Sequence, residues 1–342
     1  MRYDQRVIRI DLPHKGCGRV LGVDTSAYTT SLAVVNDGQV QWEASLVLPV
    51  PIGQRGMRAS DAVFHHVKNL PDLYDRCVRE TGFVSYRAVS VSTKPRPTVE
   101  SYFPHFVAGL SSAELIATTL GVPLVRTTHQ EGHIRAGLYG TSEDFGDRFH
   151  ALHISGGTTE LLRVERKSPG RFQMVLEGGS DDLFAGQFID RIGVALGLPF
   201  PSGKALEELA SHSSHPVMLP SSPPRKKAGT VWISFSGLTT AAERSIPDHQ
   251  AQDVARGVEV ALSRTLIALV RSAMAPGPLL IVGGVAANRQ LRNDCDRELN
   301  PDQGWRVRFG TPALSRDNAV GVALIGWDRI SAGKGDEDVT NS

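Results

Sequence analysis

Two histidines separated by three residues are the strongest chemical signal in this sequence of 342 residues. His129 and His133 stand in the segment HQEGH, and side chains at positions i and i+4 share one face of a helix. Two imidazoles placed in this way can bind a divalent metal together. The order differs from the H-E-x-x-H of zinc peptidases, because Gln130 follows the first histidine and Glu131 comes one place later. A peptidase is therefore a weak interpretation, and two polar residues on a helix face are the plain alternative.

A metal held by two imidazoles needs a further ligand. Asp317, in the segment LSRDN at 314–318, is the natural candidate. Two histidines and one carboxylate suit iron and zinc about equally, so we expect one divalent metal, Fe or Zn, without a choice between them.

Two glycine-rich segments follow apolar runs. In the first, SGGTT at 155–159, glycines let the backbone approach a ligand closely, and successive N–H groups can form an anion-binding nest. In the second, Gly283 and Gly284 lead from the apolar run 281–282 into a helical stretch that begins near Asn288, so a helix N-terminus could hold phosphate or ribose. An ordinary hairpin turn and a simple strand–turn–helix joint are the alternatives for these two segments.

The elements that must position these residues come in two similar sets. The runs 20–24 and 31–35 are rich in β-formers, and Asn36-Asp37-Gly38 has the residues of a tight hairpin turn before a third strand at 39–48. In the second half, a strand at 148–154, a glycine turn and a strand at 160–164 repeat this order. The repetition predicts duplicated α/β lobes with a cleft between them.

Further elements are predicted from hydrophobic spacing and from Gly and Pro. We expect helices at 61–81 (interrupted or restarted at Pro71), 111–120, 185–196 and 253–274, strands at 87–92 and 279–282, and a loop at 93–104. The segment 211–229 is rich in Ser and Pro and carries Arg225-Lys226-Lys227, which predicts a flexible surface loop.

Composition narrows the class of protein. Hydrophobic residues make up 41% and charged residues 21%, which is typical of a globular soluble chain. A net charge of +1 does not by itself indicate a nucleic-acid partner. Three distant cysteines argue against a disulfide framework and for the cytoplasm. We expect no membrane span and no signal peptide, because the chain has no apolar run of ~18 residues and its first residues mix charges with isolated apolar side chains.

Seven segments in one order resemble the tRNA threonylcarbamoyladenosine transferases, the TsaD/Gcp-like family formerly described as O-sialoglycoprotein endopeptidase-like. The resemblance runs from about residue 20 to residue 327. The segments are HxxxH at 129–133, SGGTT at 155–159, DLFAGQFID at 182–190, LGLPFPSG at 196–203, SFSGLTTA at 234–241, GGVAANRQLR at 283–292 and SRDNAV at 315–320.

The resemblance implies an α/β fold of two lobes, the actin/hexokinase-like (ASKHA) type, with duplicated lobes and an interlobe cleft. The first lobe is expected at 1–126 and the second at 127–312. A C-terminal helix near 313–330 is expected to pack back on the first lobe.

The resemblance also implies an activity: metal-dependent transfer of a threonylcarbamoyl group from an acyl-adenylate to an adenosine of tRNA. It implies an adenylate or ATP-type nucleotide as ligand, and tRNA, a smaller paralogous subunit and an ATPase as partners. By resemblance the metal lies at His129, His133 and Asp317, the phosphate at Ile154, Ser155, Gly156, Gly157 and Thr158, and the nucleotide at Asp190, Gly203 and Asn288, with Asp190 at the ribose. No residue is assigned a catalytic role.

Several positions depart from the family pattern. In the first loop, Ala27, Tyr28 and Thr29 stand where Cys-Asp-Glu is usual, so two acidic residues are missing while Asp24 keeps an early carboxylate. The loop at 94–97, KPRP, replaces a Gly-Pro-Gly-Leu. The other departures are Thr158 for His or Asn, Glu160 for Gln, Leu183 for Asp and Ser202 for Gly.

These departures indicate a divergent paralogue and leave a second hypothesis open, a non-catalytic regulator or assembly partner that binds nucleotide and metal. An endopeptidase and a sugar or acetate kinase are weaker alternatives, because the histidine pair would be unexplained in a kinase.

Overall fold

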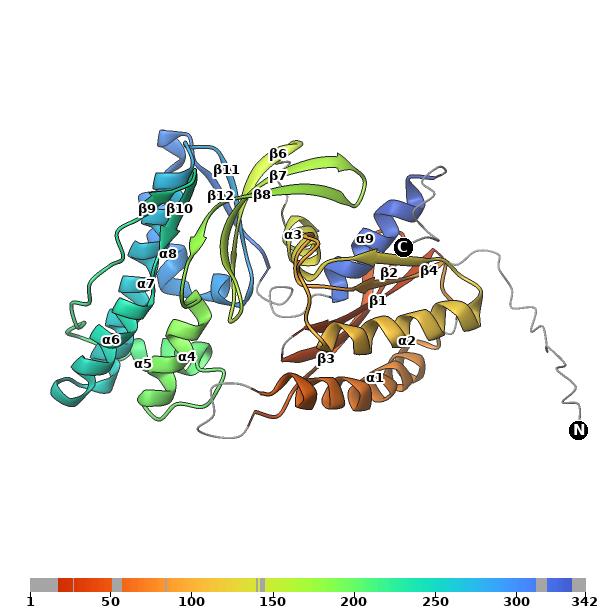
Figure 1. The fold of residues 1–342 in the computed structure, drawn as a ribbon, viewed down its shortest axis with the longest axis horizontal. Coiled ribbons are helices and arrows are strands. Elements are labelled where there is room, and N and C mark those ends of the chain that lie inside the picture. Colours follow the sequence, from red (N-terminus) through yellow and green to blue (C-terminus); the bar gives the residue numbers. More distant parts are fainter. Residues whose placement is uncertain are drawn as a thin grey trace, which may run out of the picture.

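Two mixed sheets with helices between and around them form the protein (Figure 1). The computed structural model describes residues 18–26, 28–50, 57–83, 85–139, 141, 145–311 and 319–333. Within them, no helix is both long enough and apolar enough to cross a membrane. The predicted α/β class is confirmed.

The first sheet has the strand order β3-β2-β1-β4-β5. Its first three strands form an antiparallel meander, and β4 and β5 add in parallel beside β1. Asp37 and Gly38 have φ values of 50° and 75°, the left-handed backbone that a tight hairpin between β2 and β3 requires. The strands are β1 (Arg19–Ser26), β2 (Thr29–Asn36), β3 (Gln39–Val47), β4 (Ala88–Ser92) and β5 (Leu124–Thr127).

The second sheet repeats this order and extends it. Strands β8, β7 and β6 form the meander, β11 and β12 add in parallel beside β6, and β10 and β9 continue the sheet beyond β8. The predicted duplication is therefore confirmed. The strands are β6 (Arg148–Ile154), β7 (Thr159–Ser168), β8 (Arg171–Ser180), β9 (Arg225–Lys227), β10 (Thr230–Ile233), β11 (Pro278–Val282) and β12 (Arg306–Phe309).

The helices form layers on both sheets. Helices α1 (Ala59–Thr81) and α2 (His105–Leu120) share an apolar core with one face of the first sheet, and α9 (Ala319–Ser331) packs on its other face. Helix α3 (His129–Tyr139) packs on α9 and on the inner face of the second sheet. The two helices thus lie between the sheets (Figure 1).

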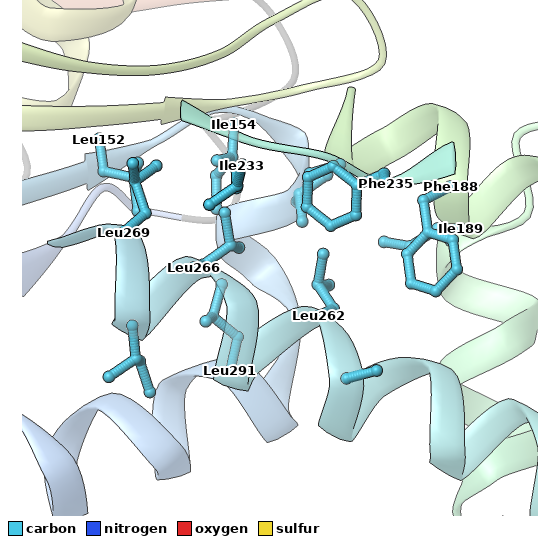
Figure 2. Packing of buried hydrophobic residues seen from close by; sticks show 14 of the residues in the cluster. Leu152, Ile154, Phe188, Ile189, Ile233, Phe235, Leu262, Leu266, Leu269 and Leu291 are labelled. Carbon is cyan, nitrogen blue, oxygen red and sulfur yellow. The ribbon is translucent and has the colours of Figure 1, made fainter. Parts of the chain in front are cut away.

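The outer face of the second sheet carries the largest core cluster, in which Leu152 and Ile154 of β6 meet Leu262, Leu266 and Leu269 (Figure 2). The helices that contribute to this cluster are α4 (Ala185–Ala195), α5 (Gly203–Ala210), α6 (Ser236–Ser245), α7 (Ala251–Ala273) and α8 (Arg289–Glu298). Three short 3-10 turns lie between these elements: η1 (Ile246–Asp248) between α6 and α7, η2 (Gly284–Ala287) between β11 and α8, and η3 (Pro301–Gln303) between α8 and β12.

Helices α3 and α9 cross with their backbones in contact. A Cβ atom added at Gly321 would lie 1.9 Å from the carbonyl oxygen of Gly132. Gly22 of β1 is equally constrained, since its Cβ would lie 2.3 Å from the carbonyl oxygen of Ala319. These glycines set how closely the helix that carries the histidine pair approaches the first lobe.

Pro71 does not interrupt the first helix, so that prediction was wrong. It lies exposed inside the continuous helix α1. Leu70, Leu73 and Cys77 are buried on both sides of it and share the core of the first sheet. This packing holds both halves of the helix in line, although proline removes one backbone hydrogen bond.

The segment 211–229 was predicted as a flexible loop, and this is corrected in part. Residues 225–227 form β9, which pairs antiparallel with β10, and Arg225 also makes an ion pair of 3.1 Å with Asp181. Helix α2 begins at His105 rather than at residue 111, and strands β5, β8, β10 and β12 were not predicted.

Candidate functional site

The predicted histidine pair lies on one helix, as expected. His129 begins α3, His133 follows one turn later, and their Nε2 atoms are 3.1 Å apart. His133 is buried, with 4% of its surface exposed, and His129 is partly buried. The i, i+4 spacing therefore brings one nitrogen of each ring to the same point in the interior.

Asp24 orients the first of these histidines. It lies near the end of β1 with 1% of its surface exposed, and both of its oxygens are 3.2 Å from Nδ1 of His129. The hydroxyl of Ser92 donates to the same carboxylate. Burial alone would raise the pKa of Asp24, but the His129 imidazole and the Ser92 hydroxyl hold this pKa below its usual value. An ionised Asp24 favours the proton on Nδ1 of His129 and leaves the lone pair on Nε2.

A third histidine adjoins the pair. The ring of His153, on β6, lies 4.7 Å from the ring of His133, centroid to centroid. Within the described residues, both ring nitrogens of His153 and Nδ1 of His133 are buried without a hydrogen-bond partner. Burial lowers the pKa of His133, and it lowers that of His153 to about 3, so both rings are neutral. The neutral imidazole is the form that binds metals.

The histidine pair fits the implied metal, and the full ligand set is not visible. The Nε2 atoms of His129 and His133 are 3.1 Å apart, so one ion could lie at bonding distance from both, about 2.0–2.1 Å for zinc. The carboxylate behind His129 is the outer partner that metal-bound histidines usually have. Among the described residues no three His, Cys, Asp or Glu side chains form a complete metal site. The third predicted ligand, Asp317, lies outside the described residues.

The loop at 93–104 supports the start of α3. The carbonyl oxygens of Lys94 and Pro95 accept from the N–H groups of His129 and Gln130, each at 3.0 Å. Such bonds satisfy first-turn donors that have no partner inside the helix. The loop of the first lobe therefore holds the histidine helix by its N-terminus.

The same loop reaches the second sheet. Arg96 makes an ion pair of 2.8 Å with Glu160 at the start of β7, and Gln130 donates to Glu160 at 2.7 Å. Glu160 is buried at the position opposite His153 on β6. The network thus connects the loop, the histidine helix and the strands beside the predicted phosphate turn.

The predicted phosphate turn joins β6 to β7 with its glycines exposed. A Cβ atom at Gly156 or Gly157 would meet nothing within 4 Å, so the outer side of the turn is open. The N–H of Ser155 donates to the carbonyl of Thr158 at 2.8 Å. Gly186, at the start of α4, packs so closely on the turn that its Cβ would lie 2.7 Å from the nitrogen of Gly156. Ile154 itself is fully buried in the core.

The second glycine turn lies beside the first. Strands β6 and β11 are parallel neighbours, and a Cβ at Gly283 would lie 2.3 Å from the carbonyl oxygen of Ile154. Gly284 is exposed, with nothing within 4 Å of its Cβ position. Ligands of α/β proteins commonly bind beyond the carboxyl ends of adjacent parallel strands.

Asp190 and Gly203 lie close together on α4 and α5. Oδ1 of Asp190 accepts from the N–H of Ser202 at 2.7 Å, directly before Gly203. Gly203 has open space at its Cβ position. Burial raises the pKa of Asp190 to about 6, although the bond from Ser202 opposes this shift. A partly buried carboxylate with one hydrogen bond retains acceptor capacity for a ligand.

Asn288 connects to the same region through α5. Oε1 of Glu207, one turn after Gly203, accepts from the N–H of Arg289 at 2.7 Å. The side chain of Asn288 caps α8 by accepting from the N–H of Leu291 at 2.9 Å. Hydrogen bonds thus connect α5 to both sides of the region: one joins Ser202, beside Gly203, to Asp190, and one joins Glu207 to Arg289, beside Asn288.

Aromatic side chains of the two lobes meet over this region. The ring of Tyr28, in the altered first loop, makes an edge-to-face contact with that of Phe200, with centroids 5.5 Å apart. Burial, together with the charge of Asp190, raises the pKa of Tyr28. Tyr28 was predicted only as a replacement for an acid, and its contact with the second lobe was not expected.

Sequence reasoning missed four residues that the structure places at these sites. Asp24 had been noted only as a remaining carboxylate. Each of the four is a single polar residue in its strand, loop or helix, and no spacing pattern in the sequence marks it as part of a site. They are Asp24, Arg96, His153 and Glu259, the last of which binds Asn288.

Comparison with known proteins assigns the chain to a family. The family described as tRNA N6-adenosine threonylcarbamoyltransferase (TsaD) matches residues 52–324. An enzyme of that name from Thermus thermophilus is 33% identical over 92% of this chain and 94% of its own. The one from Carboxydothermus hydrogenoformans is 30% identical over 92% of this chain and 93% of its own.

Solved structures support the fold. The activator of 2-hydroxyisocaproyl-CoA dehydratase from Clostridium difficile, with bound ADPNP, covers 93% of this chain and 99% of its own at a TM-score of 0.57 and 13% identity. Component A of the (R)-2-hydroxyglutaryl-CoA dehydratase of Acidaminococcus fermentans covers 92% and 99% at a TM-score of 0.58 and 16% identity. The fold is the expected actin/hexokinase-like one. The chain belongs to the tRNA N6-adenosine threonylcarbamoyltransferase family.

Proposed function

We propose that this protein transfers a threonylcarbamoyl group from an acyl-adenylate to an adenosine of tRNA, with the help of one divalent metal. The observation that carries the proposal is the arrangement of Asp24, His129 and His133 beside an open glycine turn. The family relationship supports the reaction type and the tRNA substrate.

His129 and His133 would hold the metal, with Asp317 as the proposed third ligand. A bound Fe or Zn ion would polarise a carbonyl or phosphate oxygen of the acyl-adenylate. Asp24 keeps the proton of His129 on Nδ1, so Nε2 stays available as a ligand. Burial of His133 keeps its ring neutral for the same purpose.

The nucleotide would lie across the two glycine turns of the second lobe. The N–H groups of Gly156 and Gly157 would face the phosphate, because both glycines are open to solvent; the N–H of Gly157 would leave the Ser155 hydroxyl, to which it donates at 3.2 Å. Asp190 would accept from ribose hydroxyls, and Gly203 leaves room for the sugar. Asn288 would meet the nucleoside from the neighbouring strand end. We further propose that a smaller paralogous subunit and an ATPase assist the reaction.

A second candidate is a nucleotide- and metal-binding paralogue without transferase activity. The contact between Tyr28 and Phe200 favours it, since this pair spans the lobes where the family has acidic residues in the first loop. Hydroxyls of Thr25 and Thr30 could still reach a ligand only by rearrangement, because both are buried. Nucleotide binding would nevertheless survive better than transfer, because the proposed nucleotide residues Asp190, Gly203 and Asn288 lie outside the first loop.

One experiment separates the two candidates. Purified protein receives threonylcarbamoyl-adenylate and unmodified tRNA, with and without the partner proteins, and the modified nucleoside is measured. The transferase proposal predicts product that falls in the Asp24→Asn variant, which loses the charge behind His129. AMP binding without product under every condition would instead support the paralogue. Neither binding nor product would reject both candidates.

A further inference from the structure

A buried carboxylate fixes the orientation of Asn288. Oε1 of Glu259, on α7, accepts from Nδ2 of Asn288 at 2.7 Å, and Oε2 pairs with Arg256 at 2.7 Å. Glu259 has 1% of its surface exposed. Both carboxylate oxygens therefore act as acceptors toward groups that can only donate.

The carboxamide of Asn288 has only one orientation that satisfies its partners. Its Oδ1 accepts from the N–H of Leu291, and this N–H cannot pair with an amide NH₂. Its Nδ2 faces Glu259, which Arg256 keeps in an acceptor role. A flipped amide would set nitrogen against a backbone N–H and oxygen against a carboxylate, so both hydrogen bonds would be lost.

We propose that Glu259 is a positioning residue that makes Asn288 a hydrogen-bond donor to the nucleotide. With one Nδ2 hydrogen committed to Glu259, the described residues leave the second for a ligand. The site then selects a nucleoside that presents an acceptor atom, such as a ring nitrogen, at this point. The inference rests on the proposed nucleotide site and goes beyond it by assigning the polarity of the contact and the residue that sets it.

Arg256 and Gln290 complete the support. Arg256 donates to Oε1 of Gln290 at 2.9 Å as well as to Glu259, and Gln290 donates to Asp294 at 3.0 Å. Burial raises the pKa of Glu259 to about 7, opposed by the Asn288 bond and the Arg256 charge. Packing alone does not require a carboxylate here, because a methionine would fill the same space without the free-energy cost of burying a charge.

Two substitutions at Glu259 test the role. Glu259→Gln keeps one acceptor for Asn288 and turns its NH₂ toward Arg256, which retains Gln290 as an acceptor at 2.9 Å, whereas Glu259→Met keeps the volume and removes both acceptors. We expect Glu259→Gln to bind AMP within about threefold of the wild-type protein. Glu259→Met should bind AMP at least about tenfold more weakly, as expected for a lost hydrogen bond and a misplaced amide. Calorimetric titration measures both, and equal affinities of the two variants would overturn the inference.

A reversed pair separates structure from ligand contact. Asn288→Asp still caps α8 but places two carboxylates together, so it should lower the melting temperature. Adding Glu259→Gln restores a donor–acceptor pair with the opposite polarity and should recover most of that loss. The double variant should nevertheless bind AMP at least about tenfold more weakly than wild type, since its remaining ligand-facing atom is an acceptor.

The outcomes are distinguishable. A stable double variant that binds AMP like wild type would show that no donor from Asn288 is used. If the wild-type protein binds no AMP, the proposed nucleotide site itself fails, and the inference fails with it.

Discussion

Replacing Asp190 by Asn should make the protein more stable above neutral pH. Burial raises the pKa of Asp190 from 3.8 to about 6, so ionising this carboxyl group costs more free energy in the folded protein than in the unfolded chain. An asparagine has no proton to lose and keeps an oxygen that can accept from the N–H of Ser202. The side-chain volume barely changes.

The sign follows from proton binding. Between pH 3.8 and about 6 the folded protein holds more protons at this site than the unfolded chain, so stability falls as pH rises and then stays constant. A pKa difference of about 2 between the folded and unfolded states is worth at most about 3 kcal/mol, and contact with water reduces this limit. Asp190→Asn should therefore match wild type near pH 4 and exceed it by about 1–3 kcal/mol at pH 8.

Urea denaturation at pH 4, 6 and 8 measures this difference. Asp182→Asn is the matched control with the opposite sign. Burial opposes ionisation of Asp182, but bonds from Ser234, Ser236 and Phe235 hold its pKa well below the usual value. Its ionised form stabilises the fold above about pH 4, so this variant should be less stable than wild type at pH 8. The reasoning would be refuted if Asp190→Asn is less stable than wild type at pH 8, or if the difference in their free energies of unfolding does not change with pH.

Three further predictions concern the helix that carries the histidine pair. Gly321→Ala should lower the melting temperature and weaken metal binding, because its Cβ would force α3 and α9 apart; unchanged values for both would contradict the contact. The double variant His129→Ala/His133→Ala should purify without the metal that wild type retains, whereas the exposed His249→Ala should keep it, as measured by elemental analysis. Arg96→Met should destabilise the fold by up to about 3 kcal/mol, since it removes the cation from a buried glutamate while Arg96 is partly exposed and Gln130 still donates to that glutamate, and a neutral result in urea denaturation would show that the ion pair is not required.

Local patterns predicted the parts of the fold that depend on neighbouring residues. The meanders at the start of each lobe follow from short runs of β-forming residues, and in the first lobe also from the turn at Asp37 and Gly38. The short strands β5 and β12 pair in parallel with strands that are distant in sequence, so no local pattern predicts them. The interruption predicted at Pro71 was wrong because tertiary packing, which the local sequence does not show, holds this proline inside α1.

The candidate site shows the same division. The pair His129 and His133 was predictable because a helix alone brings positions i and i+4 together. Asp24 and His153 come from strands of different sheets, and only the packing of α3 between those sheets brings them to the pair. The donor polarity of Asn288 likewise depends on Glu259, 29 residues earlier in the chain.

Glu160 and the first loop differ in the contacts that surround them. Glu160 would be a buried charge on its own, but the loop at 94–97 supplies Arg96 at 2.8 Å and α3 supplies Gln130 at 2.7 Å. An isolated buried carboxylate is costly, so the glutamate and the arginine are compatible only together. The ion pair therefore holds the loop at 94–97 against β7, and the bond from Gln130 holds the histidine helix to the same carboxylate. In the described part of the first loop, Tyr28 instead makes an aromatic contact with Phe200. Any loss of transferase activity should accordingly originate in the first loop rather than in the loop at 94–97.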